Sequence, residues 1–195
     1  GYPFRTLFAA SPGRGVLRSD DGGRSWFYVN GDGDLLAGAE ITDLFVHPDF
    51  DGTTNRTLYA AVYGKGVYRS LDGGASWALL ASASLGNTRV ICLGFGKDIA
   101  STGYLFAGCR STSGQVGLWE YTGSAWTSKA GTLGMSVSAI GTRDDFYDFP
   151  WIFIGTEAHG AHRSTDHGAT FTAINSGLPA SARIYDLKVS PGFGT

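Results

Sequence analysis

Short runs of apolar or alternating residues, each about five residues long, follow one another along this chain. Residues 41–46 alternate between apolar and polar positions as a half-buried strand does, and residues 57–62 are apolar almost throughout. Gly, Pro, Asn and Asp separate the runs, and none of them shows the period of a helix. Runs of this kind, joined by short turns, predict antiparallel strands and an all-β protein.

One polar turn recurs between these runs with a fixed pattern, Ser-x-Asp-x-Gly-x-Ser/Thr followed by Trp or Phe. A degenerate copy, which lacks the Asp, ends at Trp126. The closing aromatic residues recur about every 50 residues, a period typical of propellers and solenoids. The defining residues of the three full copies are Ser19, Asp21, Gly23, Trp26, Ser70, Asp72, Gly74, Trp77, Ser164, Asp166, Gly168 and Phe171.

Each copy has the composition of a tight turn between two strands. The Asp accepts hydrogen bonds from nearby backbone N–H groups, and the Gly adopts a positive φ without steric cost. The aromatic residue then begins the next strand with a large apolar side chain to bury. We therefore predict a hairpin at every copy, with the Asp in a structural role.

The repeated turn resembles the Asp-box, or BNR, repeat of sialidases, xyloglucan-cleaving glycosidases and sortilin-like receptor domains, which are β-propellers. The resemblance extends through the whole chain by its period. In that family the box lies on the outer hairpin of a blade, away from the active site. The resemblance therefore implies structural roles for Asp21, Asp72 and Asp166, and it specifies a fold more closely than an activity.

The repeat divides the chain into four units. Residues 184–191 repeat residues 41–48 nearly position for position, whereas the first unit lacks such a strand. We expect one domain, residues 1–195: a β-propeller of four four-stranded antiparallel blades, its ring closed by the C-terminal strand joining the N-terminal blade. Two alternatives stay open, namely four repeats of a larger ring and a pair of chains that makes eight blades. The expected units are residues 1–30 with 183–195, 31–82, 83–130 and 131–182.

The composition of this chain excludes some classes of binding partner and favours one location. It has 195 residues, a formal net charge of −2 and scattered Lys and Arg, so we expect no binding to nucleic acid. No apolar run is long enough to cross a membrane, so we expect no membrane insertion. Little Lys, much Gly and many aromatic residues are typical of secreted β-proteins, which predicts an extracellular or cell-surface location.

Two cysteines, Cys92 and Cys109, are expected to form a disulfide. They lie on the first two strands of the third unit, at nearly opposite positions if these strands form a hairpin. Opposite Cβ atoms in antiparallel strands are about 4.5–5.5 Å apart, which strand twist brings within reach of a bridge. A pair of free cytosolic thiols would be equally ordinary on spacing alone.

No set of residues has the pattern of a catalytic site, so we expect no enzymatic activity. Arg18, Arg69 and Arg163 occupy one place in three repeats, just before the box Ser, and so reflect the symmetry of the blades more than an arginine triad. Glycoside hydrolysis would need a pair of carboxyl groups across a cleft. None of the three glutamates forms such a pair on the sequence; they are Glu40, Glu120 and Glu157.

One acidic loop has half of a calcium-binding pattern. Asn30, Asp32 and Asp34 show the alternate spacing of oxygen ligands. The sixth position of the loop is Leu35 instead of Gly, and the twelfth is Ile41 instead of Glu. We expect no metal ion and no cofactor.

Two features bear on glycans. Asn55 begins the pattern Asn-Arg-Thr, which is a glycosylation acceptor in secreted proteins, and the sequence leaves its modification open. Tyr63, Trp119, Tyr121 and Trp151 would stack on sugar rings if they were exposed, or pack between blades if they were buried.

Two classes of function follow. The first is a non-enzymatic structural or interaction propeller, one bead of a tandem-repeat fibre outside the cell, whose partners are copies of itself in a head-to-tail or strand-exchanged array. The second is a carbohydrate-binding or glycoside-hydrolase-type propeller, or a fragment of one, with glycans as partners. The seamless period and the lack of a catalytic set favour the first.

Overall fold

The computed structural model describes residues 6–81, 85, 89–97, 100, 102–110, 116–132, 134–143 and 151–190. Its strands form four antiparallel sheets, one for each predicted unit, which we call blades one to four. The expected all-β architecture is thus confirmed for this part of the chain. Two short 3-10 turns, η1 (Asp32–Asp34) and η2 (Ala130–Thr132), follow the last strands of blades one and three.

Each blade is a meander in which consecutive strands are neighbours. Blade one consists of β1 (Leu7–Ser11), β2 (Gly15–Ser19) and β3 (Phe27–Tyr28). Blade two consists of β4 (Ile41–Val46), β5 (Leu58–Val62), β6 (Gly66–Ser70) and β7 (Ala78–Leu79). Blade three consists of β8 (Arg89–Lys97), β9 (Gly103–Arg110), β10 (Gly117–Tyr121) and β11 (Trp126–Ser128). Blade four consists of β12 (Val137–Arg143), β13 (Trp151–Thr156), β14 (Ala161–Ser164) and β15 (Thr172–Ala173).

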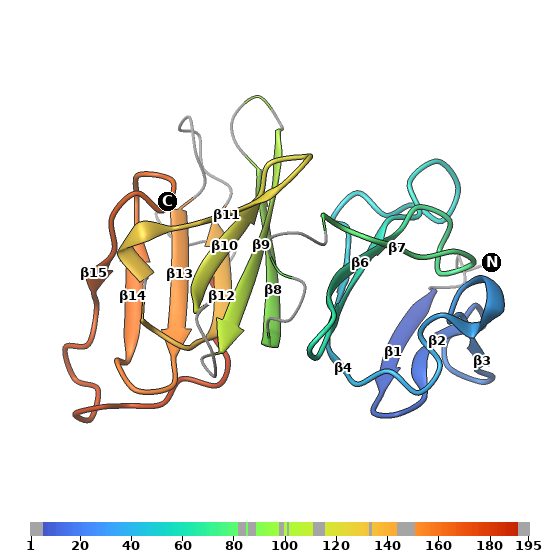
Figure 1. Ribbon diagram of the computed structural model, residues 1–195, viewed down its shortest axis with the longest axis horizontal. Helices are drawn as coiled ribbons and strands as arrows, with labels where there is room; N and C mark the ends of the chain where they lie inside the picture. Colours follow the sequence, from blue (N-terminus) through green and yellow to red (C-terminus); the bar gives the residue numbers. More distant parts are fainter. Residues whose placement is uncertain are drawn as a thin grey trace.

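The four blades stand side by side in a row, with blade one and blade four at opposite ends (Figure 1). Strands β4, β8 and β12 are the first strands of their blades, and each has a β-bulge near its start. The bulge in β4 falls between Ile41 and Asp43, and that in β8 falls between Val90 and Cys92. A bulge at the same place in successive blades strengthens strand twist there and marks it as a built feature of the repeat.

The hydrophobic core lies between adjacent blades. One buried cluster joins blades one and two around Val16 and Trp77, a second joins blades two and three around Leu85 and Trp126, and a third joins blades three and four around Phe106. Each sheet therefore buries both of its faces only when a blade stands on either side of it, because apolar area removed from water drives the packing.

The expected closed ring is not observed among the described residues. There β1 pairs only with β2, so blade one has three strands, and residues 184–190 belong to no strand. These residues pack on blade four instead, where the Ile184 N–H donates to the Thr156 carbonyl at 3.0 Å. The division of the chain into a single domain stays a prediction.

Candidate functional site

The box residues form three nearly identical hydrogen-bonded turns. In each, the buried Ser hydroxyl accepts a bond from the backbone N–H of the Gly four residues later, at 2.8 Å, as Gly74 donates to Ser70. The same hydroxyl donates to the Asp carboxylate at 2.7–2.8 Å. The Ser must be small and have both a donor and an acceptor to occupy this place, which explains the first letter of the pattern.

The Asp carboxylates are engaged within their own turns. Asp166 accepts the backbone N–H of Thr170 at 2.9 Å and its hydroxyl at 2.6 Å, and Asp21 and Asp72 make the equivalent bonds. The Thr170 bonds lower the pKa of Asp166 to about 2, because they stabilise the charged form. A carboxylate with this set of donors is not available as an acid or a base near neutral pH.

The box aromatic residues join each blade to the one before it. The Trp77 indole N–H donates to the Val29 carbonyl of blade one at 2.8 Å, and the Trp126 indole donates to the Leu80 carbonyl of blade two at 3.1 Å. Both indoles are buried, with 7% and 3% of their surface exposed. Each acceptor carbonyl lies three residues after the box aromatic of its own blade, so the contact repeats with the sequence.

The box aromatic of blade one is exposed, unlike those of blades two and three. Trp26 has 42% of its surface in contact with solvent. The matching acceptor position at the other end of the chain is Ile174, whose N–H bonds to Ala161 as the Val29 N–H bonds to Val16. Ile174 is itself 38% exposed. The donor and the acceptor of a further inter-blade contact are therefore both uncovered.

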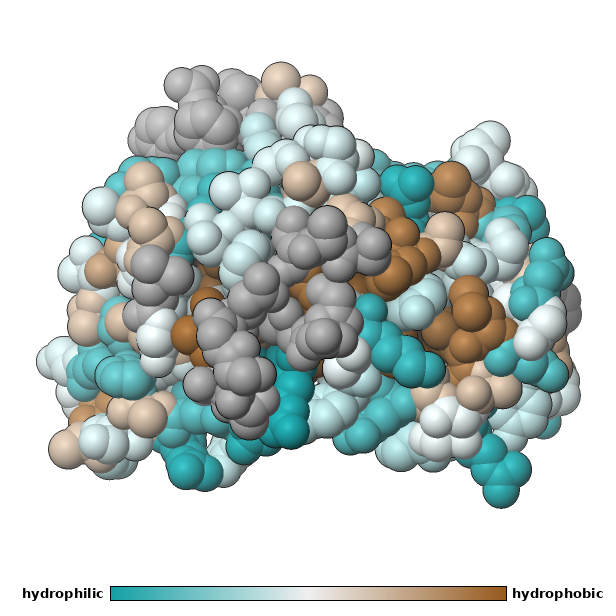
Figure 2. Space-filling model, viewed as in Figure 1, coloured by the Kyte–Doolittle hydropathy of each residue, from teal (hydrophilic) through white to brown (hydrophobic). Residues whose placement is uncertain are grey.

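Large hydrophobic residues are exposed at several places in the described part of the chain. Figure 2 shows hydrophobic surface on the half of the molecule that contains blades one and two. Other large hydrophobic residues are exposed in blade four and after it. Exposed apolar patches on a soluble protein mark interaction sites. The exposed large hydrophobic residues are Leu7, Trp26, Phe27, Tyr28, Leu35, Val46, Leu71, Leu79, Ile174, Leu178 and Tyr185.

Residues 184–189 lie on blade four in the way that a first strand lies on the preceding blade. The Ser138 hydroxyl donates to the Ile184 carbonyl at 2.5 Å, as the Thr42 hydroxyl of blade two donates to the Val90 carbonyl of blade three at 2.7 Å. The small residue Gly155 makes room for Ile184, since an added Cβ would lie 2.5 Å from its side chain. Residues 184–189 thus occupy the position on blade four that the first strand of a following blade would occupy.

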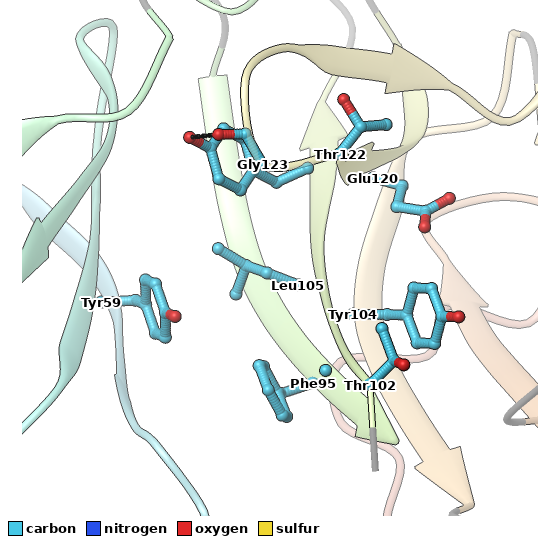
Figure 3. Close-up of a pocket in the computed structure, with 10 residues that line it drawn as sticks. Tyr59, Phe95, Thr102, Tyr104, Leu105, Glu120, Thr122 and Gly123 are labelled. Atoms are coloured by element: carbon cyan, nitrogen blue, oxygen red, sulfur yellow. Dashed lines mark hydrogen bonds between the residues drawn. The ribbon is translucent and has the colours of Figure 1, made fainter. Parts of the chain in front are cut away.

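A groove of about 500 Å³ opens between blades two and three. Tyr59 of β5 lies on one side, and Phe95 and Leu105 of blade three lie on the other (Figure 3). Tyr104 and Glu120 also contribute to the lining, but their side chains point away from Tyr59 toward blade four, where both contact His167. An apolar groove lined by aromatic side chains has the character of a small-ligand site.

Glu120 is held by basic side chains from two blades. Its carboxylate pairs with Lys129 and with Nε2 of His167, the latter at 2.9 Å. Burial opposes the charge of Glu120, but the bonds from His167 and Lys129 outweigh it and lower the pKa of the carboxyl. The His167 ring stacks edge-on against Tyr104, with centroids 4.5 Å apart. This geometry holds Glu120 ionised and fixed as a structural link between blades three and four.

The three repeated arginines lie in equivalent places on β2, β6 and β14. Arg18 pairs with Asp20 of its own blade at 2.7 Å, and Arg163 lies over the Trp151 ring of its own blade at 5.3 Å. These two side chains therefore have local partners, as expected for residues that reflect blade symmetry.

The expected disulfide is absent from the structure. Cys92 and Cys109 are free and buried thiols. Cys92 lies opposite Gly108 and Cys109 lies opposite Val90. The hairpin register already places Cys92 one residue away from Cys109, and the bulge between Val90 and Cys92 moves Cys109 one residue further. Burial raises the pKa of the Cys109 thiol to about 12, which makes it unreactive.

Asn30, the first residue of the partial calcium-binding pattern, has a structural role. Asn30 is buried, and its side chain accepts the Val16 N–H at 2.8 Å and donates to the Arg14 carbonyl at 3.1 Å. Asn175 makes the same two kinds of bond in blade four. Among the described residues, no three His, Cys, Asp or Glu side chains gather as a metal site.

The possible glycosylation site lies in a structured loop. Asn55 Oδ1 accepts the Thr57 N–H at 3.0 Å, and its amide nitrogen lies 3.3 Å from a ring nitrogen of His47. No helix in the described part of the chain is long and apolar enough to span a membrane.

Comparison with known proteins supports the fold. The chain is similar to the GH74 xyloglucanase from Xanthomonas campestris, with a TM-score of 0.65 and 21% identity over 88% of this chain and 28% of that chain. It is similar to the extracellular domain of a one-component system from B. thetaiotaomicron, with a TM-score of 0.63 and 15% identity over 93% of this chain and 23% of that chain. A GH74 enzyme from Niastella koreensis matches 86% of this chain and 27% of its own, with a TM-score of 0.61 and 15% identity.

These solved structures are β-propellers, so the likeness shows that this chain has the fold of propeller blades. The chain spans less than a third of the length of each of them. No protein-family model matches the chain, and no curated protein matches it.

Proposed function

We propose that this chain is a non-enzymatic structural and interaction module of the Asp-box type, a bead of an extracellular or cell-surface array whose partners are copies of itself. The observation that carries the proposal is the pair of uncovered, complementary faces at its two ends. Trp26 is exposed in blade one, while the equivalent Trp77 and Trp126 are buried by the preceding blade.

In this proposal residues 184–190 supply the missing strand of blade one. Either the chain supplies it to itself and closes a four-bladed ring, or one copy supplies it to the next. Both arrangements pair the open edge of β1, which otherwise presents free backbone groups for association with another strand.

The lack of enzymatic activity is supported by the state of the acidic groups. The three box carboxylates are saturated by donors of their own turns, and Glu120 is paired with Lys129 and His167. Glycosidases need a second carboxyl group across the scissile bond. The described lining of the groove contains one.

Light scattering of the purified chain across a range of concentrations tests the proposal. We expect an increase in mass with concentration, and no hydrolysis of aryl-sialosides or xyloglucan oligosaccharides. A chain that stays monomeric without a paired β1 edge, or that hydrolyses either substrate above background, contradicts it.

A second candidate function is binding or cleavage of glycans. The aromatic groove between blades two and three favours it, because aromatic faces pack on sugar rings. Calorimetry with xyloglucan oligosaccharides tests this candidate, with Tyr121→Ala as the variant that should abolish heat of binding. Tyr63→Ala is the matched control, since Tyr63 lies outside the described groove lining.

A further inference from the structure

We infer that the groove between blades two and three binds a small carboxylate with an aromatic or apolar body, whose carboxylate is held by Arg69 and the Trp119 indole. The body of the ligand packs on Tyr59, Phe95 and Tyr121, which line the groove. The inference goes beyond the proposed function, and its ligand is of a different class from the glycans of the second candidate.

The degenerate box of blade three borders this groove. Trp119 stands where the other copies have the box Ser, and Tyr121 stands where they have the box Asp, as counted back from Trp126. Tyr121 lines the groove together with Thr122 and Gly123 of the same turn. The copy that departs from the repeat pattern is therefore the one that lies at this groove.

The strand pairing places Arg69 and Trp119 on the facing surfaces of one interface. Arg69 lies directly opposite Tyr59 in blade two, so the two side chains leave the sheet on the same face. That face packs on blade three, because Tyr59 and Val67 belong to the core cluster between these two blades. Trp119 packs against the same cluster from blade three. The guanidinium and the indole thus meet the same inter-blade space.

Blade one shows how far an arginine at this place reaches. Arg18 is the equivalent residue there, and its Nη1 donates across the blade boundary to the Gly73 carbonyl of the next box at 3.4 Å. In blade three the position of Gly73 is held by Thr122, which lines the groove. This correspondence places the Arg69 guanidinium at the edge of the groove. Burial raises the pKa of the neighbouring Tyr59 hydroxyl, and the charge of Arg69 opposes that increase.

Arg69 has no carboxylate partner among the described residues, unlike Arg18. Arg18 pairs with Asp20, two positions further along, at 2.7 Å, whereas Leu71 stands two positions after Arg69. Nε of Arg69 and Nε1 of Trp119 are buried, and neither has a hydrogen-bond acceptor within the described part of the chain. Buried donors without an acceptor cost free energy. A carboxylate that accepts from both side chains removes that cost.

The lining determines the rest of the ligand. Tyr59 faces Phe95 and Leu105 across the groove, and these side chains offer aromatic and apolar surface to a planar body (Figure 3). Glu120 points away toward blade four, so its charge does not oppose an anion here. A guanidinium matches a carboxylate in shape and charge. One cation with one neutral donor suits the single charge of a carboxylate better than the nearly double charge of a phosphate.

Calorimetry with 2-naphthoate and the purified chain tests the inference. Two compounds serve as controls: 2-naphthamide has the same rings without the charge, and acetate has the charge without the rings. We expect naphthoate to bind about tenfold more tightly than naphthamide, because only the carboxylate makes charge-assisted hydrogen bonds. We expect acetate to bind more weakly still, because it buries no ring. Equal binding of naphthoate and naphthamide would overturn the inference.

Substitutions in the chain locate the site. Arg69→Gln removes the charge beside the groove, and Arg163→Gln is the matched control, because it is the same change at the same place in blade four. We expect naphthoate to bind about tenfold more weakly to Arg69→Gln and unchanged to Arg163→Gln. Trp119→Phe keeps an aromatic ring but removes the N–H, and should weaken naphthoate binding about fivefold. Naphthamide binding should stay the same in both groove variants.

The remaining outcomes each decide the matter. Absence of naphthoate binding, or an equal loss in the two arginine variants, overturns the inference. If Arg69→Gln does not fold in urea titrations, the comparison of naphthoate with naphthamide on the native chain still decides it. Binding of xyloglucan oligosaccharides but not of naphthoate overturns it in favour of the second candidate. The proposed function is tested separately, since light scattering of the chain alone measures its self-association.

Discussion

Replacing Trp77 by Ala removes the side chain that joins blade two to blade one. The ring is 93% shielded from solvent in the core cluster between these blades, and its N–H donates to the Val29 carbonyl at 2.8 Å. The substitution leaves a cavity the size of an indole and an unpaired carbonyl. Truncation of a buried Trp costs about 3–5 kcal/mol.

Trp26→Ala is the matched comparison, because it is the same change at the same place in the repeat. Its ring is 42% exposed and, among the described residues, makes no hydrogen bond to another blade. We expect this variant to lose about 1 kcal/mol, close to the range for partly exposed positions. The difference between the two variants, about 2–4 kcal/mol, measures what one inter-blade contact contributes.

Urea unfolding monitored by circular dichroism at low protein concentration measures both values. Low concentration is necessary because association of copies would cover Trp26. We expect a marked decrease in the midpoint for Trp77→Ala and a small one for Trp26→Ala. Equal losses in dilute solution would refute the inter-blade role of the box aromatic residues.

Three further predictions concern the turns and the thiols. Ser70→Ala should lower the free energy of unfolding by about 1–3 kcal/mol in urea titrations, because the buried Gly74 N–H loses its acceptor; an unchanged midpoint contradicts this. Stability should decrease as the pH falls from about 4, the pKa of an unfolded Asp, toward the folded value of about 2 for Asp166. Asp166→Asn should flatten this decrease in acid titrations, and an identical slope speaks against it. Cys92 and Cys109 should react with a chromogenic disulfide at pH 8 only after unfolding, and rapid reaction of the native chain would disprove their burial.

The strands and the four sheets could be predicted from the sequence because their signals are local. Alternation in residues 41–46, glycine-rich turns and the repeated box each depend on a few neighbouring residues. The box geometry is equally local, since the side-chain hydrogen bonds described above for Ser70 and Asp72 lie within the turn.

The cysteine pairing could not be predicted in this way. It depends on a register known to within one residue, and the hairpin places Cys92 opposite Gly108 instead of Cys109. Sequence reasoning also missed the inter-blade bonds of Trp77 and Trp126, although the three-residue spacing to the acceptor recurs with the repeat. Contacts between blades join residues about 50 positions apart, so they appear only when the sheets are placed side by side.

Residues 184–190 show where the sequence pattern is ambiguous. Their match to residues 41–48 identifies a first strand. It does not say whether this strand joins blade one of the same chain or blade one of another copy. In the structure the segment packs on blade four, as the first strand of each blade packs on the preceding blade. Among the described residues, no strand pairs with its backbone.

Hydrogen exchange measured by mass spectrometry, at a series of protein concentrations, tests the central claim most directly, because the claim concerns the backbone edge of β1. We predict that peptides covering residues 7–11 and 184–190 exchange fast in dilute solution and become protected together as the concentration rises. Peptides of β5, which is paired on both sides, should be protected throughout. Fast exchange of residues 184–190 at every concentration, with β5 protected, would contradict the account.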